Sequence, residues 1–405
     1  MDISVIGLGY IGLPTALLFA KSGHNVAGVD ISGDVVRSLN EGRLHFEETG
    51  LDELFSEASG KFSAREDLLS SDVYIIAVPT PLDKEMKLAD LKAVKSAAES
   101  VSSVLKEGQT VIIESTIPPG TSHNFIKPIL DRSGAGKYFF SHCPERAIPG
   151  KTIEEMVEND RIVGGIDDDS TRFTVELYRS FVRGRMFETD ITTAEFVKLM
   201  ENTYRDINIA LANEFALIGE ELGIDIWKAI DLANKHPRVN IHSPGPGVGG
   251  HCIAIDPWFM VEKSSHSKIV NLAREINTFM PIHVMKLVKD IIDGYRIKKI
   301  TIFGVSYKGN VDDTRESPAF KVARIAESEG IEVSFYDPLA GYGDLDGAVE
   351  DTDCIVLITD HDLFRDVDPR KLLVRHKNMV DSRNILDHQR WIEAGFRVNV
   401  LGIGR

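Results

Sequence analysis

The first thirty residues carry the pattern that most restricts how this chain can fold. An apolar segment at residues 2–6 runs into the glycine-rich sequence GLGYIG at residues 7–12, and a further apolar stretch begins near Pro14. A second apolar segment, NVAGVD, ends at Asp30. Strand, glycine turn, helix and strand in this order predict a βαβ unit of the Rossmann type, whose glycines admit a pyrophosphate to the helix N-terminus. The acid about 20 residues after the glycines would accept hydrogen bonds from ribose hydroxyls, and its charge would favour NAD over a 2′-phosphorylated dinucleotide.

Polar residues follow two more apolar segments of this first unit. Residues 72–81 and 110–121 each begin as a predicted strand, and Thr80, Ser115 and Thr116 come after the apolar part. Ligands of open parallel sheets lie beyond the carboxyl ends of the strands, so these hydroxyls would lie beside the nicotinamide ribose. On position alone, they are equally typical of turns. The predicted cofactor contacts are Gly7, Gly9, Tyr10, Ile11, Gly12, Asp30, Arg37, Thr80, Ser115 and Thr116.

The remainder of the chain predicts a helical centre and a second α/β unit. Residues 192–223 predict one long helix, with Thr192 and Glu195 as a capping box at its start and Gly223 as its stop. Residues 266–295 are again helical in pattern, and strands alternate with a helix after them. We therefore predict an α/β fold with two Rossmann-like, doubly wound parallel-sheet domains joined by a central region that contains a long helix. The predicted domains are residues 1–190, 191–295 and 296–405.

The composition excludes several classes of function. The formal net charge of −16 argues against nucleic acid as a partner, because an acidic surface repels phosphate backbones. No apolar run approaches the length of a membrane span, and residues 2–10 resemble a strand rather than an export signal. Three cysteines, Cys143, Cys252 and Cys354, are too few and too scattered for a disulfide framework or a metal cluster. We expect a cytoplasmic protein without a bound metal, in which Cys143 and Cys354 are packed in the core.

One stretch, SPGPGVGGHCIAIDPWF at residues 243–259, places a cysteine in a glycine-rich loop. Its glycines allow the backbone to approach a ligand closely, and its prolines stiffen the loop. Asp256 before Pro257 predicts a helix start with the aspartate as N-cap, so the helix dipole would favour a thiolate at Cys252. The alternative is a loop with a buried cysteine and an ordinary cap.

A reactive thiol beside a dinucleotide site widens the chemistry that the chain can perform. NAD takes an alcohol to an aldehyde without covalent help, but oxidation of an aldehyde to an acid needs a tetrahedral adduct that gives up hydride. A thiolate supplies that adduct as a thiohemiacetal, which becomes a thioester. Lys198, Asn202 and Arg205 are spaced four and three residues apart on the predicted long helix, where they form either a polar stripe suited to an oxyanion or a solvated face.

Seven sequence motifs resemble those of the UDP-glucose/GDP-mannose dehydrogenase family, in the same order and over nearly the whole chain. They are GLGYIGLP, VPTP, ESTIPPGT, CPER, KLMENTYRD, GPGVGGHCIAIDPWF and GVSYKGNVDDTRESP. The resemblance implies NAD-dependent, four-electron oxidation of the C6 alcohol of a nucleotide sugar to a uronate, with the UDP-sugar bound by the C-terminal domain. It also implies that a neighbouring subunit can lend Arg238, so that a homodimer or larger assembly shares the active site.

The resemblance further implies roles for individual residues. The implied catalytic residues are Cys252 as nucleophile, Lys198 as the lysine that stabilises the alkoxide and tetrahedral oxyanion, Asn202 as its partner, Asp256 and Thr116 as the pair that positions a water, and Glu145 as the carboxylate of thioester hydrolysis. The implied substrate contacts are Glu145, Arg146, Ala147, Lys198, Asn202, Arg205, His236, Arg238, His242, Gly249, Tyr307, Lys308 and Arg383. Arg315 resembles a cofactor contact.

The cysteine loop departs from glucose-specific members of the family at positions that bear on the sugar. Ile255 stands where UDP-glucose and GDP-mannose enzymes typically have lysine, and GGHCIAIDPWF resembles the N-acetylhexosamine branch. Ala254 and Trp258 favour UDP-N-acetyl-D-mannosamine as the substrate, with UDP-N-acetylglucosamine or UDP-glucose as alternatives. A two-electron hydroxyacid dehydrogenase and a non-catalytic sensor of NAD and nucleotide sugars are the other functions compatible with the first domain.

Overall fold

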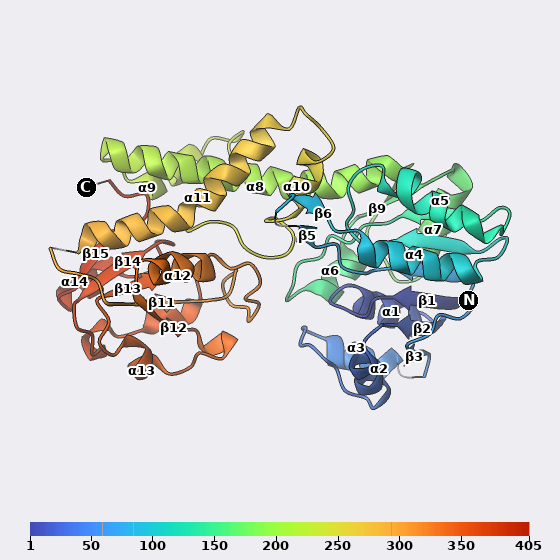
Figure 1. Cartoon of the computed structure of the whole chain (residues 1–405), viewed down its shortest axis with the longest axis horizontal. Coiled ribbons are helices and arrows are strands. Elements are labelled where there is room, and N and C mark those ends of the chain that lie inside the picture. The colour runs from blue at the N-terminus through green and yellow to red at the C-terminus, as the bar shows by residue number, and fades with distance from the viewer. Residues whose placement is uncertain (59, 84, 293, 405) are drawn as a thin grey trace. The chain divides into compact units, whose positions relative to one another are not determined.

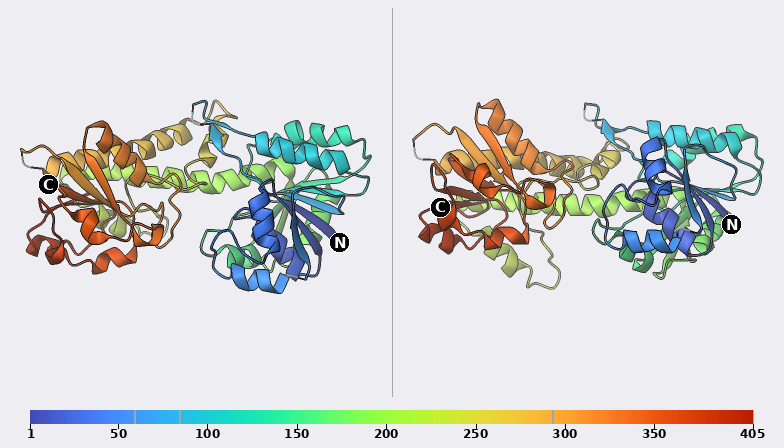
Figure 2. Two further views of the ribbon diagram at one scale, coloured as in Figure 1. Left: turned by 60° about the horizontal axis from the view of Figure 1, so that its bottom comes forward. Right: turned by 90° about the horizontal axis from the view of Figure 1, so that it is seen from below.

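The computed structural model describes residues 1–58, 60–83, 85–292 and 294–404 (Figure 1). These residues form two compact units. The first comprises Met1–Glu201 and Trp258–Ser265, and the second comprises Asn202–Pro257 and His266–Arg405. Helix α8 (Ile191–Leu222) is continuous and contributes to both units (Figures 1 and 2). The division into three domains at residues 190 and 295 stays a prediction.

The described residues of the first unit form an eight-stranded sheet whose centre is the glycine-rich βαβ unit. From one edge to the other the strands are β10 (Met186–Asp190), β9 (Arg161–Gly165), β8 (Phe139–His142), β7 (Thr110–Ile113), β4 (Val73–Ile76), β1 (Asp2–Ile6), β2 (Asn25–Val29) and β3 (Phe62–Arg65). Neighbouring strands are parallel, except that β8 and β9 run antiparallel. Parallel strands place their carboxyl ends at one edge of the sheet, where ligands of such folds bind.

Helices cover both faces of this sheet because successive strand residues point to opposite sides. Val73 and Ile75 pack against one set of helices, and Tyr74 and Ile76 pack against another. The first set is α1 (Gly12–Lys21), α3 (Leu51–Ala58), α6 (Thr152–Glu158) and α7 (Asp168–Tyr178), and the second is α4 (Lys92–Val104) and α5 (Lys127–Leu130). The unit also contains α2 (Gly33–Asn40), the helical turns η1 (Ser122–Ile126) and η2 (Asp131–Ser133), and a hairpin of β5 (Leu82–Asp83) and β6 (Leu88–Ala89).

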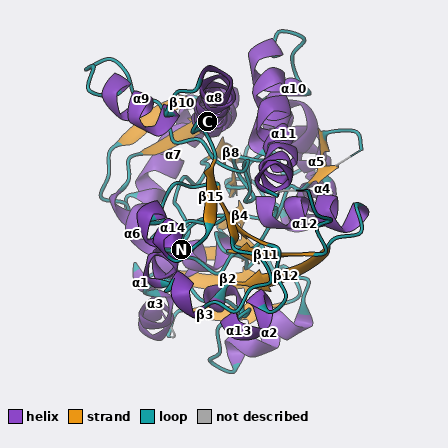
Figure 3. Cartoon of the chain, turned by 90° about the vertical axis from the view of Figure 1, so that its left-hand side faces the viewer, coloured by secondary structure: helices purple, strands orange, loops and turns teal. Residues whose placement is uncertain are grey.

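The described part of the second unit contains a five-stranded, all-parallel sheet. Its strands, in order, are β12 (Glu332–Tyr336), β11 (Lys299–Phe303), β13 (Cys354–Leu357), β14 (Asn378–Asp381) and β15 (Arg397–Val400). Ile300 and Ile302 pack with α11 (Lys268–Ile291) and α12 (Pro318–Ser328), which lie side by side (Figure 3). Phe303 faces the other side, with Trp391 of α14 (His388–Glu393). The remaining elements are α9 (Ile226–Ala233), α13 (Leu345–Val349), η3 (Pro338–Ala340), η4 (Asp362–Asp366) and η5 (Pro369–Lys371). Helix α10 (Asp256–Val261) has residues of both units. The predicted α/β fold class is therefore confirmed.

The start of α8 corrects the predicted capping box. The Asp190 carboxylate, and not Thr192, accepts the first amide hydrogen bonds, from the N–H groups of Thr192 (3.0 Å) and Thr193 (2.9 Å). Glu195 is buried and accepts instead from the N–H groups of Gly120 and Ser122, at 2.5 and 2.7 Å. Its carboxylate is thus used by a segment distant in sequence.

Burial confirms the predicted state of two cysteines, since Cys143 and Cys354 are both fully buried. At the far end of α8, Gly223 adopts a φ of 70°, which confirms the predicted helix stop. Among the residues that the structure describes, no helix is both long and apolar enough to cross a bilayer.

Candidate active site

The glycine turn after β1 has the shape that a dinucleotide phosphate requires. Gly7 has a φ of 92°, and a Cβ atom there would lie 2.7 Å from the Ala77 carbonyl oxygen. At Gly12 a Cβ atom would lie 1.8 Å from the Gly7 carbonyl oxygen, so only glycine fits. No side chain caps the N-terminus of α1 in the structure, which leaves amide groups directed at the turn. These residues therefore fit the pyrophosphate of NAD.

Asp30 is held at the carboxyl end of β2, as the prediction of a ribose contact requires. One carboxylate oxygen accepts from the Leu8 N–H and the other from the Ser32 N–H, both at 2.9 Å. Arg37 lies on the exposed side of α2 and forms an ion pair with Asp34. Its contact with the adenosine side stays a prediction.

The hydroxyls predicted beside the nicotinamide brace the ends of β4 and β7. Thr80 donates to the Thr116 carbonyl at 2.6 Å, and Ser115 donates to the Val78 carbonyl at 2.7 Å. Their protons are therefore used within the protein, as in the turn interpretation. Their oxygens can still accept a hydrogen bond from a ligand.

The turn after β8 is organised by Glu145, whose side chain is buried. One carboxylate oxygen accepts from the N–H groups of Arg146 (2.6 Å) and Ala147 (2.8 Å), and the other accepts from the Arg161 guanidinium. Arg146 itself forms an ion pair with Glu201 (2.5 Å) and donates to the Asp160 carbonyl. To contact a substrate, Arg146 would have to exchange these partners.

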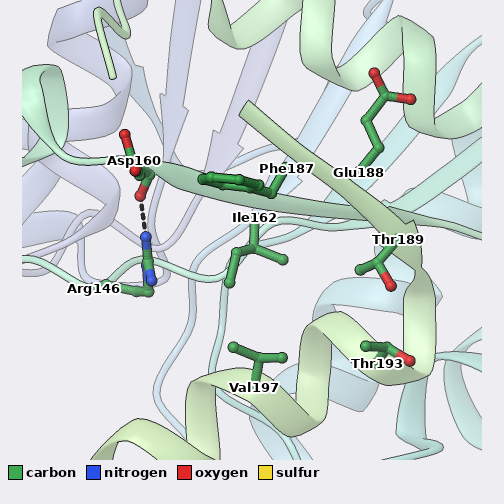
Figure 4. Close-up of a pocket in the computed structure, with 8 residues that line it drawn as sticks. All are labelled: Arg146, Asp160, Ile162, Phe187, Glu188, Thr189, Thr193 and Val197. Carbon is green, nitrogen blue, oxygen red and sulfur yellow. Dashed lines mark hydrogen bonds between the residues drawn. The ribbon is translucent and has the colours of Figure 1, made fainter. Parts of the chain in front are cut away.

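Arg146 also lines a pocket of about 320 Å³ at the edge of the first sheet (Figure 4). The figure shows the Arg146 side chain directed at Asp160, with Phe187 and Val197 on the walls. The full lining is Arg146, Asp160, Ile162, Phe187, Glu188, Thr189, Thr193 and Val197. Arg146 is the single predicted site residue among them, so this pocket is not the predicted active site.

Lys198 is a buried cation, and the solvated-face interpretation of its stripe is wrong. Its side chain is 8% exposed, and no residue that the structure describes forms a hydrogen bond or ion pair with it. The neighbouring His142 is fully buried, and both of its ring nitrogens lack a partner among the same residues. Burial, together with the charge of Lys198, lowers the pKa of His142 to about 3, so its imidazole is neutral. Lys198 is thus available to an anionic ligand group.

The second unit contains a chain of hydrogen bonds from Arg205 through Asn202 to Asp256. Arg205 donates to the Asn202 side-chain oxygen, and the Asn202 amide donates to the Asp256 carboxylate. Asn202 is 1% exposed and Asp256 is 4% exposed, so the pair is buried. An ionised Asp256 held in this way can accept a proton or orient a water.

The loop that carries the cysteine differs from the predicted cap. Asp256 is the first residue of α10, and not its N-cap, because its carboxylate is taken by Asn202. The turn begins at Cys252, whose carbonyl accepts from the N–H groups of Ile255 (3.1 Å) and Asp256 (2.8 Å). Cys252 is exposed, so the alternative of a buried cysteine is wrong.

Close packing against residues 305–316 explains the glycines of this loop. A Cβ atom at Gly249 would lie 2.8 Å from the Glu316 carbonyl oxygen, and one at Gly250 would lie 2.9 Å from the Tyr307 ring. The Gly250 N–H donates to the Arg315 carbonyl at 3.0 Å. Burial, together with the negative charges of Asp313 and Cys252, raises the pKa of Tyr307 to about 12. Tyr307 therefore keeps its phenolic proton and can donate it in a hydrogen bond.

The other predicted substrate contacts lie in the second unit in varied settings. His236, Arg238 and Lys308 are exposed, and His242 is partly buried, with its pKa lowered by burial and by the charge of Arg205. Arg383 donates to the Ile358 carbonyl at 2.8 Å and lies against Gly245 of the cysteine loop. Arg315 forms an ion pair with Asp313. Their contacts with ligands stay predictions.

A buried polar network behind the cysteine loop escaped sequence reasoning. Asn213 accepts from the Gly245 N–H (2.8 Å) and donates to Asn277 (2.9 Å), which donates to Asp206 (2.8 Å). Arg274 forms a buried ion pair with Asp206 at 2.6 Å and donates to the Ile253 carbonyl at 3.4 Å. Asp206 and Asn213, seven residues apart on α8, were the available signal, since polar side chains at that spacing share one helix face.

Comparison with known proteins agrees with this arrangement over the whole chain. Residues 1–182 match the NAD binding domain of the UDP-glucose/GDP-mannose dehydrogenase family, residues 192–279 match its central domain, and residues 301–388 match its UDP binding domain. The match to the first domain confirms NAD as the predicted cofactor.

Individual relatives match from end to end. A UDP-N-acetyl-D-mannosamine dehydrogenase of Methanocaldococcus jannaschii is 49% identical, with 100% of this chain and 97% of the relative covered. The structure of a UDP-D-ManNAc dehydrogenase from Pyrococcus horikoshii superimposes with a TM-score of 0.94 at 41% identity, covering 100% of both chains. The UDP-N-acetyl-mannosamine dehydrogenase Cap5O from Staphylococcus aureus gives 0.91 at 42%, covering 100% of this chain and 99% of that one. The chain therefore belongs to the UDP-glucose/GDP-mannose dehydrogenase family.

Proposed function

We propose that this chain oxidises UDP-N-acetyl-D-mannosamine to UDP-N-acetyl-D-mannosaminuronate with two molecules of NAD. The observation that carries the proposal is the exposed Cys252 in its glycine loop, whose carbonyl accepts from the N–H of Asp256, the last member of the hydrogen-bonded Arg205–Asn202–Asp256 chain. Two relatives that match 99% and 100% of the chain, at 48% and 49% identity, are named UDP-N-acetyl-D-mannosamine dehydrogenases, which supports the choice of sugar.

The proposed site uses this chain's residues in four roles. NAD held by the turn at residues 7–12 and by Asp30 would accept the hydride of the first oxidation. A second NAD, bound there after the first NADH has left, would accept the hydride of the second oxidation. In the first oxidation Asp256, with Thr116 and a water, receives the alcohol proton as C6 becomes an aldehyde carbon. Cys252 then adds its sulfur to that carbon, and Lys198 with Asn202 stabilises the resulting oxyanion.

The second oxidation would leave the sugar as a thioester on Cys252. Water adds to the thioester carbon, the carbon–sulfur bond breaks with its electron pair on sulfur, and the uronate is released. Glu145 is proposed to take a proton from that water. Lys198 suits its role because it lies buried without a counter-ion among the described residues, so an oxyanion would be its natural partner.

The identity of the sugar rests on the end of the cysteine loop. Ala254 and Trp258 are each 8% exposed, and the Lys87 ammonium lies 4.2 Å from the centre of the Trp258 ring. These residues, with Ile255 in place of lysine, favour an N-acetylhexosamine. The discriminating experiment offers UDP-ManNAc, UDP-GlcNAc, UDP-glucose and GDP-mannose with NAD and counts NADH per sugar consumed.

Two NADH per UDP-ManNAc, with little turnover of the other sugars, is the expected result. One NADH with an aldehyde or ketone product would support a two-electron hydroxyacid dehydrogenase instead. Binding of both ligands without any NADH would support a non-catalytic sensor.

We further propose a homodimer whose subunits share the active site. Tyr204, Leu211, Ile218 and Leu222 of α8 are 39–67% exposed, and at 3.6 residues per turn they fall within about 40° around the helix. This apolar stripe supports a self-association surface, and Arg238 is exposed, as a side chain lent to a neighbouring subunit must be.

Mixing two inactive variants tests the sharing directly. Cys252→Ser and Arg238→Ala should each be inactive alone, and mixed dimers should regain activity because one site then has both residues. Light scattering checks that the mixed subunits form dimers. If mixed dimers form but do not regain activity, the shared active site is refuted.

We propose three domain roles: NAD binding by residues 1–190, dimerisation by residues 191–295 and UDP-sugar binding by residues 296–405. The proposed location is the cytoplasm.

A further inference from the structure

The Glu145 carboxylate in the first unit is almost saturated with hydrogen bonds. A carboxylate has about four acceptor sites. Among the described residues three are occupied, two by the N–H groups of Arg146 and Ala147 and one by the Arg161 guanidinium. One acceptor site is left, on the carboxylate oxygen that binds Arg161. The positions of the three donors determine the direction of this site.

Arg161 is a buried cation shared between two acids. It is the first residue of β9, next to β8, and its side chain is 4% exposed. One arm of the guanidinium binds Glu145, and the other lies 3.3 Å from Glu114 and 3.8 Å from the Cys143 sulfur. The guanidinium carbon lies 4.8 Å from the centre of the Tyr178 ring, in a cation–π contact.

Glu114 does not depend on Arg161 in the same way. Its carboxylate also accepts from the hydroxyls of Thr15 and Tyr178, both at 2.9 Å. Burial raises the pKa of Glu114 to about 7, so near neutral pH this acid is protonated in much of the population. The positive charge of Arg161 is therefore directed chiefly at Glu145, the acid with no other side-chain donor among the described residues.

We propose that Arg161 is a positioning residue for the last step of the reaction. Its guanidinium holds the Glu145 carboxylate with a single acceptor site left, and that site would serve the water that hydrolyses the Cys252 thioester. In that step a carbon–oxygen bond forms from the water, the carbon–sulfur bond breaks, and the water proton passes to Glu145. The proposal rests on the proposed function and adds a residue that touches neither the substrate nor the cofactor.

Arg161→Lys is the first test, because lysine keeps the charge but cannot bridge two acids with a planar fork. The purified variant is mixed rapidly with UDP-ManNAc and NAD, and NADH is followed together with the intact protein mass. We expect a burst of two NADH per active site, a steady rate reduced about 100-fold and a thioester adduct on Cys252. Glu145→Gln should behave in the same way.

Two further variants serve as controls. Glu114→Gln removes the other acid that Arg161 contacts, and its steady rate should stay within about threefold of the wild type. If Arg161→Lys fails to fold, the double variant Arg161→Gln/Glu114→Gln takes its place, because it removes Arg161 together with the second buried acid that Arg161 contacts. Circular dichroism and calorimetric NAD affinity establish that each variant is folded.

The outcomes are distinct. A burst followed by slow turnover in Arg161→Lys or in the double variant supports the positioning role. A steady rate within about threefold of that of Glu114→Gln, or a loss of the burst itself, overturns it. If the wild type yields only one NADH per sugar, the proposed function fails first, and the role of Arg161 in hydrolysis fails with it.

Discussion

Replacing Glu114 by glutamine should make the protein more stable at alkaline pH and change its stability little at acidic pH. Glu114 follows β7 and is 3% exposed. Burial raises its pKa from 4.5 to about 7, against the lowering effect of the Arg161 charge. The folded state therefore binds this proton more tightly than the unfolded state does. The stabilisation that results is complete below about pH 4.5 and is lost as the pH rises through 7.

The size of the effect follows from the two pKa values. A shift of about 2.5 units corresponds to on the order of 3 kcal/mol between the two protonation states. Integrated over the titration, the free energy of unfolding of Glu114→Gln relative to wild type should increase by about 2 to 3 kcal/mol between pH 5 and pH 8. Glutamine also alters the hydrogen bonds with Thr15 and Tyr178. Any free energy of unfolding lost in this way is the same at pH 5 and pH 8, so it cancels when the two pH values are compared.

Urea titrations followed by far-ultraviolet circular dichroism, at several pH values from 5 to 8, measure this difference. The control variant Glu176→Gln removes an exposed carboxylate of α7. Its free energy of unfolding relative to wild type should not show a comparable dependence on pH. Infrared difference spectra should also show a protonated carboxyl band in the wild type that is absent from Glu114→Gln. A stability difference that stays constant from pH 5 to 8 would refute the reasoning.

Three other predictions concern the site. Cys252→Ser should fold and bind NAD normally and form no more than one NADH per site in stopped-flow absorbance, because the first oxidation does not need the thiol. Its steady-state NADH formation from UDP-ManNAc should be at least about 1,000-fold slower than that of the wild type. Gly12→Ala should weaken NAD binding at least about 100-fold in calorimetry, because its Cβ atom would overlap the Gly7 carbonyl. Gly9→Ala, which meets nothing within 4 Å, should leave the melting temperature unchanged, so any lost affinity there reports contact with the cofactor. Asp30→Ala should narrow the preference for NAD over NADP, measured as the ratio of kcat/KM values.

Local patterns predicted the elements whose signals lie within a short stretch of sequence. The glycine turn, the long helix α8 and the loop around Cys252 all have such signals, and the structure contains them. The family resemblance added roles that composition and spacing alone left open, such as that of Glu145. These roles remain to be tested by the experiments above.

Partners distant in sequence account for what local patterns missed. Glu195 was expected to cap its own helix but accepts hydrogen bonds from Gly120 and Ser122. Asp256 was expected to cap α10 but is bound by Asn202, 54 residues earlier. Each carboxylate could either cap its own helix or bind a group that is distant in sequence, and tertiary packing decides between the two. Strand β15 has a weak local signal for a related reason, since its four residues include the polar Arg397 and Asn399 and it is held by pairing with β14.

The chain leaves the first unit after Glu201 and returns to it for Trp258–Ser265. This returning segment is bound there, because the Ala89 N–H donates to Glu262 at 2.8 Å and the Lys87 ammonium covers the Trp258 ring. During synthesis on the ribosome, the first unit consequently has to wait for residues that emerge well after its own sheet is made. A nascent chain arrested before Trp258 would therefore hold an incomplete N-terminal unit.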